Sequence, residues 1–266
     1  MTQAEALDTT FEGDGGTAAI SLDAVSKVFG HTGDATHALD RMTLEVARGE
    51  FLCLIGASGC GKSTLLNLIA GLDQPTSGTV TVRATRTSMM FQESALFPWL
   101  TARGNIELAL RLDGVPKAKR RARVDELLEL VHLEDFGDKR PHELSGGMRQ
   151  RTALARALAQ DADVLLMDEP FGALDAMTRD LLHEELEALW TRTGLTVVFV
   201  THNVREAVRL GDRVVLLTSR PGRIAEEYLV DTGRPRHIDS TAVATLAAEM
   251  TDRLREEVRR HGDPRG

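Results

Sequence analysis

Cysteine is nearly absent from this chain of 266 residues, which contains only Cys53 and Cys60. Two cysteines this close in sequence provide neither a disulfide framework nor the four ligands of a structural zinc site, a composition typical of a reducing compartment. Aromatic residues are also few, at 4% of the chain. We predict that both cysteines are buried packing residues.

Long hydrophobic runs are lacking as well. The longest, such as residues 197–200, have the length of a strand, whereas a membrane-spanning helix needs ~18–20 apolar residues. Residues 1–19 contain no Lys or Arg, and a signal peptide begins with a basic segment. We predict a flexible N-terminal tail over residues 1–19 and a chain that does not span a bilayer.

A surplus of positive charge is missing too, because 32 Lys and Arg face 40 Asp and Glu, for a net charge of −8. This balance argues against broad binding to a phosphate backbone, so we expect no nucleic-acid partner. Core material is plentiful, since 42% of the residues are hydrophobic and 27% are charged. The length favours one large domain with an embedded subdomain.

Hydrophobic patterns predict an α/β fold. Residues 20–28 and 39–46 partly alternate between apolar and polar, as half-buried antiparallel strands do. Strands buried on both faces of a parallel sheet are predicted by uninterrupted apolar runs with helical segments between them. These runs are residues 51–55, 164–167, 197–200 and 214–218.

Two helical regions are expected around this core. Residues 101–160 carry apolar side chains at helical spacing, so we predict a helical insertion of about residues 95–155. A C-terminal helical tail is predicted over residues 239–266, because 241–260 combine an apolar stripe with a basic face. The main domain is therefore expected to span residues 20–238.

The strongest motif lies between the apolar run at 51–55 and a predicted helix at 62–70. It fits G-x-x-x-x-G-K-[ST], a turn whose backbone N–H groups surround phosphate at a helix N-terminus. Lys62 would neutralise the β- and γ-phosphate oxygens, and the Ser63 hydroxyl would bind Mg²⁺. The predicted nucleotide-binding residues are Gly56, Ala57, Ser58, Gly59, Cys60, Gly61, Lys62, Ser63 and Thr64.

Two carboxylates follow the buried run at 164–167, at the edge where parallel sheets bind ligands. Asp168 would hold Mg²⁺ directly or through water. Glu169 would orient or deprotonate the water that attacks the γ-phosphate. This pair alone would be an ordinary solvated strand end, but together with the phosphate loop it indicates nucleotide hydrolysis.

A second glycine-rich turn precedes another predicted helix. Ser145, Gly146, Gly147 and Met148 combine an N-cap side chain with the backbone N–H groups of a helix start, which is a second anion site. With its motifs in this order, the chain resembles the nucleotide-binding subunits of ABC transporters over roughly residues 18–235.

The resemblance implies a three-layer α/β P-loop NTPase core with an antiparallel β edge and a helical subdomain. It also implies roles for further residues. Gln92 would approach Mg²⁺ and the attacking water, and His202 would contact the γ-phosphate. Asp175 would lie in the loop that crosses to a second subunit, and Phe29 would place its ring under adenine. Catalysis would then involve Glu169, His202, Gln92 and Lys62, with Ser63, Gln92 and Asp168 near the metal.

Partners follow from the same resemblance. Two ATPase chains, expected to form a homodimer, would face each other so that Ser145, Gly146, Gly147 and Met148 of one chain cover the γ-phosphate held by the other. ATP and Mg²⁺ would be required. The length fits a stand-alone subunit that sits at the cytoplasmic face of the plasma membrane, on integral-membrane permease subunits that are served by an extracytoplasmic substrate-binding protein.

Some features resemble a subgroup that imports nitrate, taurine, alkanesulfonates and similar small anions. They are the stretch 90–101, Met148 in the second turn, and Arg-Pro-Arg at 234–236. Phe97, Pro98 and Trp99 would form an apolar wall for a permease helix, although Trp99 fits the core of the helical insertion equally well. The few residues between Thr79 and Gln92 depart from the family pattern and predict a shortened antiparallel layer.

Other functions remain open at this point. One is a non-transport ABC ATPase that acts as a mechanical or regulatory module. Another is a small-molecule phosphotransferase, which would have an acceptor pocket and no use for Ser145. A GTPase is disfavoured because the chain has no Asn-Lys-x-Asp guanine motif.

Overall fold

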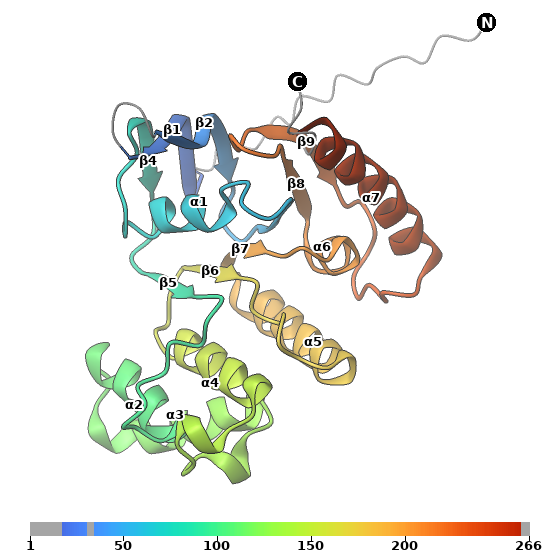
Figure 1. Ribbon diagram of the computed structural model, residues 1–266. Helices are drawn as coiled ribbons and strands as arrows, with labels where there is room; N and C mark the ends of the chain where they lie inside the picture. Colours follow the sequence, from blue (N-terminus) through green and yellow to red (C-terminus); the bar gives the residue numbers. More distant parts are fainter. Residues whose placement is uncertain (1–17, 31–34, 262–266) are drawn as a thin grey trace, which may run out of the picture.

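A six-stranded sheet runs through the centre of the computed structural model, which describes residues 18–30 and 35–261 (Figure 1). The strand order is β5-β6-β7-β3-β8-β9, in which the first five strands are parallel and β9 is antiparallel to β8. The strands are β3 (Phe51–Gly56), β5 (Thr87–Met90), β6 (Val164–Asp168), β7 (Thr196–Val200), β8 (Arg213–Leu217) and β9 (Ile224–Leu229). The predicted parallel sheet is confirmed.

The central strands are mostly apolar, and β3 is apolar along its whole length, because both faces of this sheet are covered. Phe51 and Cys53 of β3 face one hydrophobic cluster, whereas Leu52 and Leu54 face the other. All six residues of β3 are buried. Since neighbouring side chains in a strand point to opposite faces, an uninterrupted apolar run is what a sheet between two layers requires.

A second sheet and one helix cover the face of the central sheet that carries Leu52 and Leu54 (Figure 1). Its strands are antiparallel in the order β2-β1-β4, and they are β1 (Ile20–Phe29), β2 (Thr36–Val46) and β4 (Ser77–Val82). Helix α1 (Lys62–Ile69) packs between the two sheets through Leu65 and Leu66. Only residues 83–86 separate β4 from β5, so no further hairpin fits between them.

The helical region lies between β5 and β6 in sequence and forms its own lobe in Figure 1. Leu128 and Leu154 continue the main hydrophobic cluster into this lobe. The last helix continues to Leu158, slightly past the predicted limit at 155. The elements are α2 (Ala102–Leu112), α3 (Lys117–Leu130), η1 (Glu134–Phe136), η2 (Pro141–Glu143) and α4 (Gly146–Leu158).

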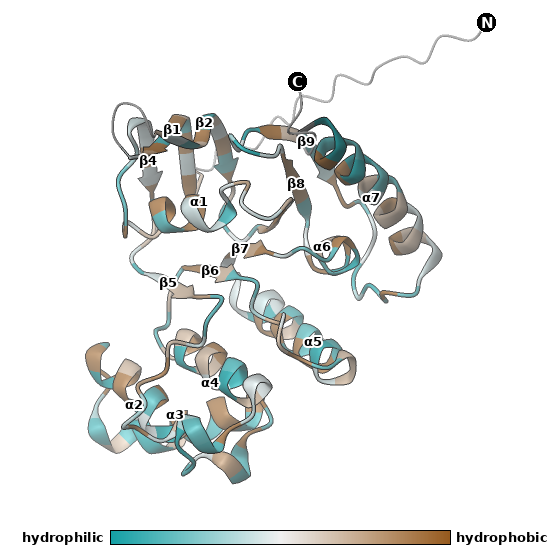
Figure 2. Ribbon diagram, viewed as in Figure 1, coloured by the Kyte–Doolittle hydropathy of each residue, from teal (hydrophilic) through white to brown (hydrophobic). Residues whose placement is uncertain are grey.

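Three helices cover the remaining face of the central sheet. They are α5 (Ala176–Thr193), α6 (Val204–Leu210) and α7 (Thr241–His261). Helix α7 packs on α6 through Val243, Ala247 and Met250, and its C-terminal turns are hydrophilic (Figure 2). The apolar stripe predicted for the C-terminal helix is therefore a packing face.

The Arg-Pro-Arg segment holds the chain that leads into α7. The guanidinium of Arg234 lies 4.3 Å from the ring centroid of Trp190 and pairs with Glu187 at 3.0 Å and Asp212 at 2.9 Å. Arg236 is 5% exposed, and its guanidinium donates to backbone carbonyls. Both arginines therefore hold the fold together through contacts within the chain.

The N-terminal tail lies mostly outside the described residues, since only Ala18 and Ala19 are described. Ala19 is 1% exposed, and its backbone N–H donates to the carbonyl of Val46 at 2.8 Å. The packed chain therefore begins slightly before the predicted limit, because Ala19 extends the antiparallel edge.

Candidate functional site

The phosphate loop connects β3 to α1 and depends on glycine at its closest approach to the neighbouring strand. Gly61 has a φ of 98°, and a Cβ at this position would lie 2.8 Å from the carbonyl oxygen of Ala38. Any larger residue would be strained and would also clash with β2. The loop is therefore held tightly against β2, and α1 begins directly after it at Lys62.

Lys62 lies within the loop. Its ammonium donates to the carbonyl oxygens of Gly56 at 2.9 Å and Ala57 at 3.0 Å, and the residue is 7% exposed. Cys60, beside it, is buried, and burial raises the pKa of its thiol. Cys53 is buried in β3, and neither cysteine is in a disulfide, as predicted.

Two acids end β6 next to this loop. Asp168 is 6% exposed and accepts a hydrogen bond from the Ser63 side chain, and burial raises the pKa of its carboxyl. Glu169 has a positive φ of 46° and donates its backbone N–H to Val200 at 3.0 Å, which ties the end of β6 to β7. Its Oε2 lies 3.2 Å from Nδ1 of His202.

A cavity of about 470 Å³ lies beside Glu169 and the phosphate loop, and Asp168 is not among its lining residues. Phe29, Gln92, Glu169 and His202 line it together with all of the predicted phosphate-loop residues except Ala57 and Cys60. Phe29 is 44% exposed, so its ring is not a core side chain. Residues that sequence reasoning placed in five separate segments are therefore brought to one cavity at the carboxyl ends of the parallel strands.

Ser145 and Asp175 lie away from that cavity, each at the start of a helix. Ser145 is exposed and accepts a hydrogen bond from the Met148 backbone N–H at 3.2 Å, which leaves Gly146 and Gly147 in the first turn of α4. Asp175 caps α5 by accepting from the Thr178 backbone at 2.9 Å, and hydrogen bonds from Thr178 lower the pKa of its carboxyl.

Sequence reasoning missed three residues that line the cavity. Thr36 and Ala38 belong to β2, and Arg220 belongs to the turn between β8 and β9. No local motif marks them, because they reach the site only when the antiparallel sheet and the β8–β9 turn pack on the phosphate loop.

A buried polar network lies directly behind His202. Nε2 of His183 lies 2.6 Å from the carboxylate of Glu206, whose other oxygen accepts from the hydroxyl of Thr201. Arg209 donates to Nδ1 of His183 at 3.4 Å and to Asp180 at 3.2 Å. His183 is fully buried. Since Arg209 only donates, Nε2 carries the proton that His183 gives to Glu206.

Two aromatic rings form an exposed pair at the entrance to the helical lobe. Trp99 is 67% exposed and Phe97 is 37% exposed, with their ring centroids 5.4 Å apart. Trp99 is therefore not part of the core, which was one of the two readings of the sequence. Isolated exposed apolar residues are common, but two exposed aromatic rings in contact are typical of a binding surface.

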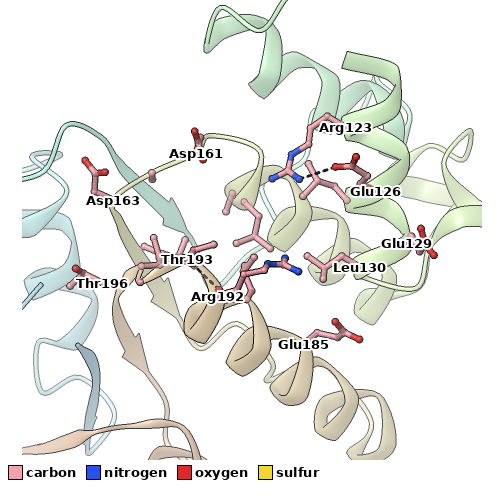
Figure 3. Close-up of a pocket in the computed structure, with 18 of the residues that line it drawn as sticks. Arg123, Glu126, Glu129, Leu130, Asp161, Asp163, Glu185, Arg192, Thr193 and Thr196 are labelled. Carbon is pink, nitrogen blue, oxygen red and sulfur yellow. Dashed lines mark hydrogen bonds and ion pairs between the residues drawn. The ribbon is translucent and has the colours of Figure 1, made fainter. Parts of the chain in front are cut away.

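A wider cleft of about 910 Å³ lies between α3 and the C-terminal half of α5. Arg123 and Glu126 of α3 face Arg192 and Thr193 of α5 across it (Figure 3). Thr196 at its rim begins β7, so this cleft lies at the amino ends of the parallel strands. Ligands of such sheets bind at the carboxyl ends. The smaller cavity is therefore the candidate site.

The oxygen donors of the cavity fit a magnesium ion. Across residues 18–30 and 35–261, no group of three or more His, Cys, Asp or Glu side chains has the arrangement of a metal site. Mg²⁺ needs no such group, because it is usually held by one or two carboxylates and by substrate phosphates. The buried carboxylate of Asp168 beside the Ser63 hydroxyl is a set of this kind.

Comparison with known proteins gives consistent matches. The family model described as ABC transporter matches residues 39–172. An uncharacterized ABC transporter ATP-binding protein of Methanocaldococcus jannaschii is 44% identical over 246 residues, which is 90% of this chain and 92% of that protein. A taurine import ATP-binding protein of Mesorhizobium japonicum is 45% identical over 250 residues, which is 88% of this chain and 96% of that protein.

A solved structure also matches. It is a dimeric ATP-binding cassette in a post-hydrolysis state bound to ADP and Pi, with a TM-score of 0.74 and 33% sequence identity. The match covers 80% of this chain and the whole of that chain. The layered fold described above is therefore shared with a cassette that has hydrolysed ATP.

Proposed function

The chain belongs to the ABC transporter family, and from that premise we propose that it is a stand-alone subunit that powers import through a separate permease. The chain binds and hydrolyses ATP. The observation that carries the proposal is the single cavity that collects Lys62, Glu169 and His202 from three strand ends of the central sheet.

The side chains of this cavity support specific roles. Lys62 neutralises the β- and γ-phosphates, which displace its present contacts with backbone carbonyls. Glu169 orients or deprotonates the attacking water, and His202, 3.2 Å from the Glu169 carboxylate, contacts the γ-phosphate. Phe29 stacks under adenine, because its exposed ring lines the same cavity.

Asp168 and the adjacent Ser63 would hold Mg²⁺. Gln92, which lines the cavity together with Ser63, would contact the metal and the attacking water. When bound there, Mg²⁺ offsets the negative charge of the phosphate oxygens. The raised pKa of Asp168 reflects burial of a carboxylate without a full cationic partner, which is an environment that a bound cation stabilises.

The turn at Ser145 acts on a second chain. Ser145, Gly146, Gly147 and Met148 start α4 outside the cavity, so within one chain they have no nucleotide to bind. A second copy, placed face to face, would bring them onto the γ-phosphate, with Asp175 in the crossing loop. The match to a dimeric cassette supports this arrangement.

We place the dimer on the cytoplasmic face of the membrane, bound to a permease that receives cargo from an extracytoplasmic binding protein. No helix among the described residues has the length and apolar character to cross a bilayer, and the Phe97–Trp99 pair is the surface offered for a permease helix. The taurine import relative supports taurine or a similar small anion as cargo, which uptake of labelled taurine by the reconstituted complex would test.

The test of this function is the oligomeric state of Glu169→Gln, measured by light scattering with and without MgATP. The variant should bind ATP without hydrolysing it, so MgATP should convert a monomer into a dimer. Glu169→Gln that hydrolyses ATP at the parent rate would overturn Glu169 as the group that activates water.

Two further variants separate binding from closure. Lys62→Ala should bind no nucleotide and remain monomeric. Ser145→Arg should bind ATP with the parent affinity yet fail to dimerise, because the cation occupies the interface that the second chain must reach. A Ser145→Arg protein with full ATPase activity would favour the phosphotransferase alternative.

A further inference from the structure

Arg220 places a second cation on the phosphate loop. Its side chain lines the cavity, and a Cβ added to Gly59 would lie 3.3 Å from its Nη2. Within the described part of the chain, the Arg220 guanidinium forms no hydrogen bond or ion pair. By contrast, the neighbouring Arg223 is paired with Asp40.

The turn that carries Arg220 is fixed against the loop. Gly222 donates its backbone N–H to Ala38 at 2.9 Å and accepts from the Asp40 N–H at 3.0 Å. A Cβ at Gly222 would lie 2.2 Å from the carbonyl oxygen of Cys60, so only glycine permits this contact. Thr218 closes the turn by donating its hydroxyl to Pro221 at 2.8 Å.

The two cations differ in what satisfies them. Lys62 has carbonyl partners at 2.9 and 3.0 Å, whereas Arg220 has a planar set of N–H donors and no partner among residues 18–30 and 35–261. Two cations that converge on one loop repel each other unless an anion lies between them. Arginine also matches phosphate oxygens with two parallel hydrogen bonds, which an ammonium cannot do.

We propose that Arg220 is a nucleotide-binding residue that contacts the polyphosphate of ATP from the side of the loop opposite the helical lobe. This proposal rests on the proposed ATP site but adds a ligand from outside the phosphate-loop motif. The residue supplies affinity for the charged part of the nucleotide and does not take part in the chemistry of hydrolysis.

The experiment is a set of dissociation constants for MgATP, MgADP and AMP, measured by isothermal titration calorimetry on the full chain. Arg220→Ala should weaken MgATP binding about tenfold, since a hydrogen bond to a charged group is lost. Arg220→Lys should recover part of that loss by restoring the charge. AMP should change less than MgATP because it lacks the β- and γ-phosphates.

The matched control is Arg121→Ala. Arg121 is exposed on α3 and has no ion pair in the described structure, so its loss changes the net charge equally without touching the cavity. Melting curves would show that each variant is folded. If Arg220→Ala binds MgATP within twofold of the parent, the proposal is wrong.

Two outcomes separate this inference from the proposed function. If Lys62→Ala abolishes binding and Arg220→Ala has no effect, the ATP site stands and Arg220 has no part in it. If neither variant weakens binding, the ATP site itself is misplaced.

A further outcome would also overturn the proposal. If Arg220→Ala leaves MgATP affinity unchanged but prevents the MgATP-dependent dimer when it is added to Glu169→Gln, then Arg220 contacts the second chain and not the nucleotide.

Discussion

Asp168 carries an electrostatic conflict that affects both binding and stability. Its carboxylate is 6% exposed; the Ser63 hydroxyl and the charge of Lys62 favour its ionised form, whereas the charge of Glu169 opposes it. Burial raises the pKa, so the folded chain holds a proton more tightly than the unfolded chain does. Stability of the nucleotide-free protein must therefore fall as the pH rises from about 4, the unfolded value, through the raised pKa.

Asp168→Asn should remove this loss, because the neutral amide still accepts the hydrogen bond from Ser63. We expect the variant to be more stable than the parent at pH 7 by on the order of 1 kcal/mol, or about 2–4 °C in Tm, and to lose Mg²⁺-dependent hydrolysis. Calorimetric melting of nucleotide-free protein between pH 4 and 8 measures this effect.

Asp175 supplies the control of opposite sign. Its pKa is lowered by hydrogen bonds from Thr178, so its contribution to stability is present above about pH 4 and is lost as the pH falls through the lowered pKa. Asp175→Ala should lower stability at pH 7 through loss of the α5 cap. If Asp168→Asn destabilises the protein as much as Asp175→Ala does, then burial of the ionised Asp168 carboxylate does not lower the stability of the nucleotide-free protein.

Helices α5 and α6 are joined by the buried network of His183, Glu206 and Arg209. This network connects α5, which Asp175 caps, to the loop that carries His202, because Thr201 in that loop donates to the Glu206 carboxylate that His183 of α5 also contacts. Phe171 packs edge-on against His183 with ring centroids 5.1 Å apart. The position of His202 therefore depends on side chains that do not line the cavity.

His183→Leu should leave one oxygen of the buried Glu206 carboxylate without its donor, while the other oxygen keeps the Thr201 hydroxyl. We expect stability to fall by about 2 kcal/mol and kcat for ATP hydrolysis to fall on the order of tenfold, with little change in KM, because His202 moves while the phosphate loop does not. Steady-state kinetics and melting curves on one preparation measure both effects.

His183→Gln is the conservative comparison. Its amide nitrogen can donate to Glu206 and its oxygen can accept from Arg209, so it reproduces the pattern of the His183 ring. If His183 positions His202, His183→Gln should have a kcat close to that of the parent. Equal kcat in the Leu and Gln variants would mean that the network has only a packing role.

Across the whole molecule, the cavity opens at one end of the parallel strands and the exposed aromatic pair lies on the chain that enters the helical lobe. This lobe is connected to the core by the segment between β5 and α2, which contains both Gln92 and Trp99. A partner that binds Trp99 would therefore act on the same segment that lines the proposed ATP cavity.

Trp99→Ala should leave Tm within about 1 °C of the parent, since the ring is 67% exposed. It should weaken association with the cognate permease at least tenfold, as loss of an aromatic anchor does. Co-purification from membranes that co-express both proteins measures this. Leu112→Ala, at an apolar residue with 79% exposure, is the control. Undiminished co-purification of Trp99→Ala would exclude Trp99 as the anchor.

The sequence by itself determined the layered α/β fold, the phosphate loop, the acid pair and the two helix-start turns. Each of these features is defined by residues that are neighbours in the sequence. Glycines allow a tight turn, and a continuous apolar run indicates a strand that is covered on both faces. Phosphate chemistry depends on residues adjacent in sequence, so the chain reveals it without its fold.

Only the tertiary structure decided which distant residues share the cavity. Arg220 reaches the loop because Gly222 packs on Cys60, and His183 supports His202 because α5 and α6 bury three polar side chains together. The exposure of Trp99 was equally undetermined, since an aromatic at a helix entry fits a core or a surface. Contacts between residues far apart in sequence arise from packing, which no local pattern encodes.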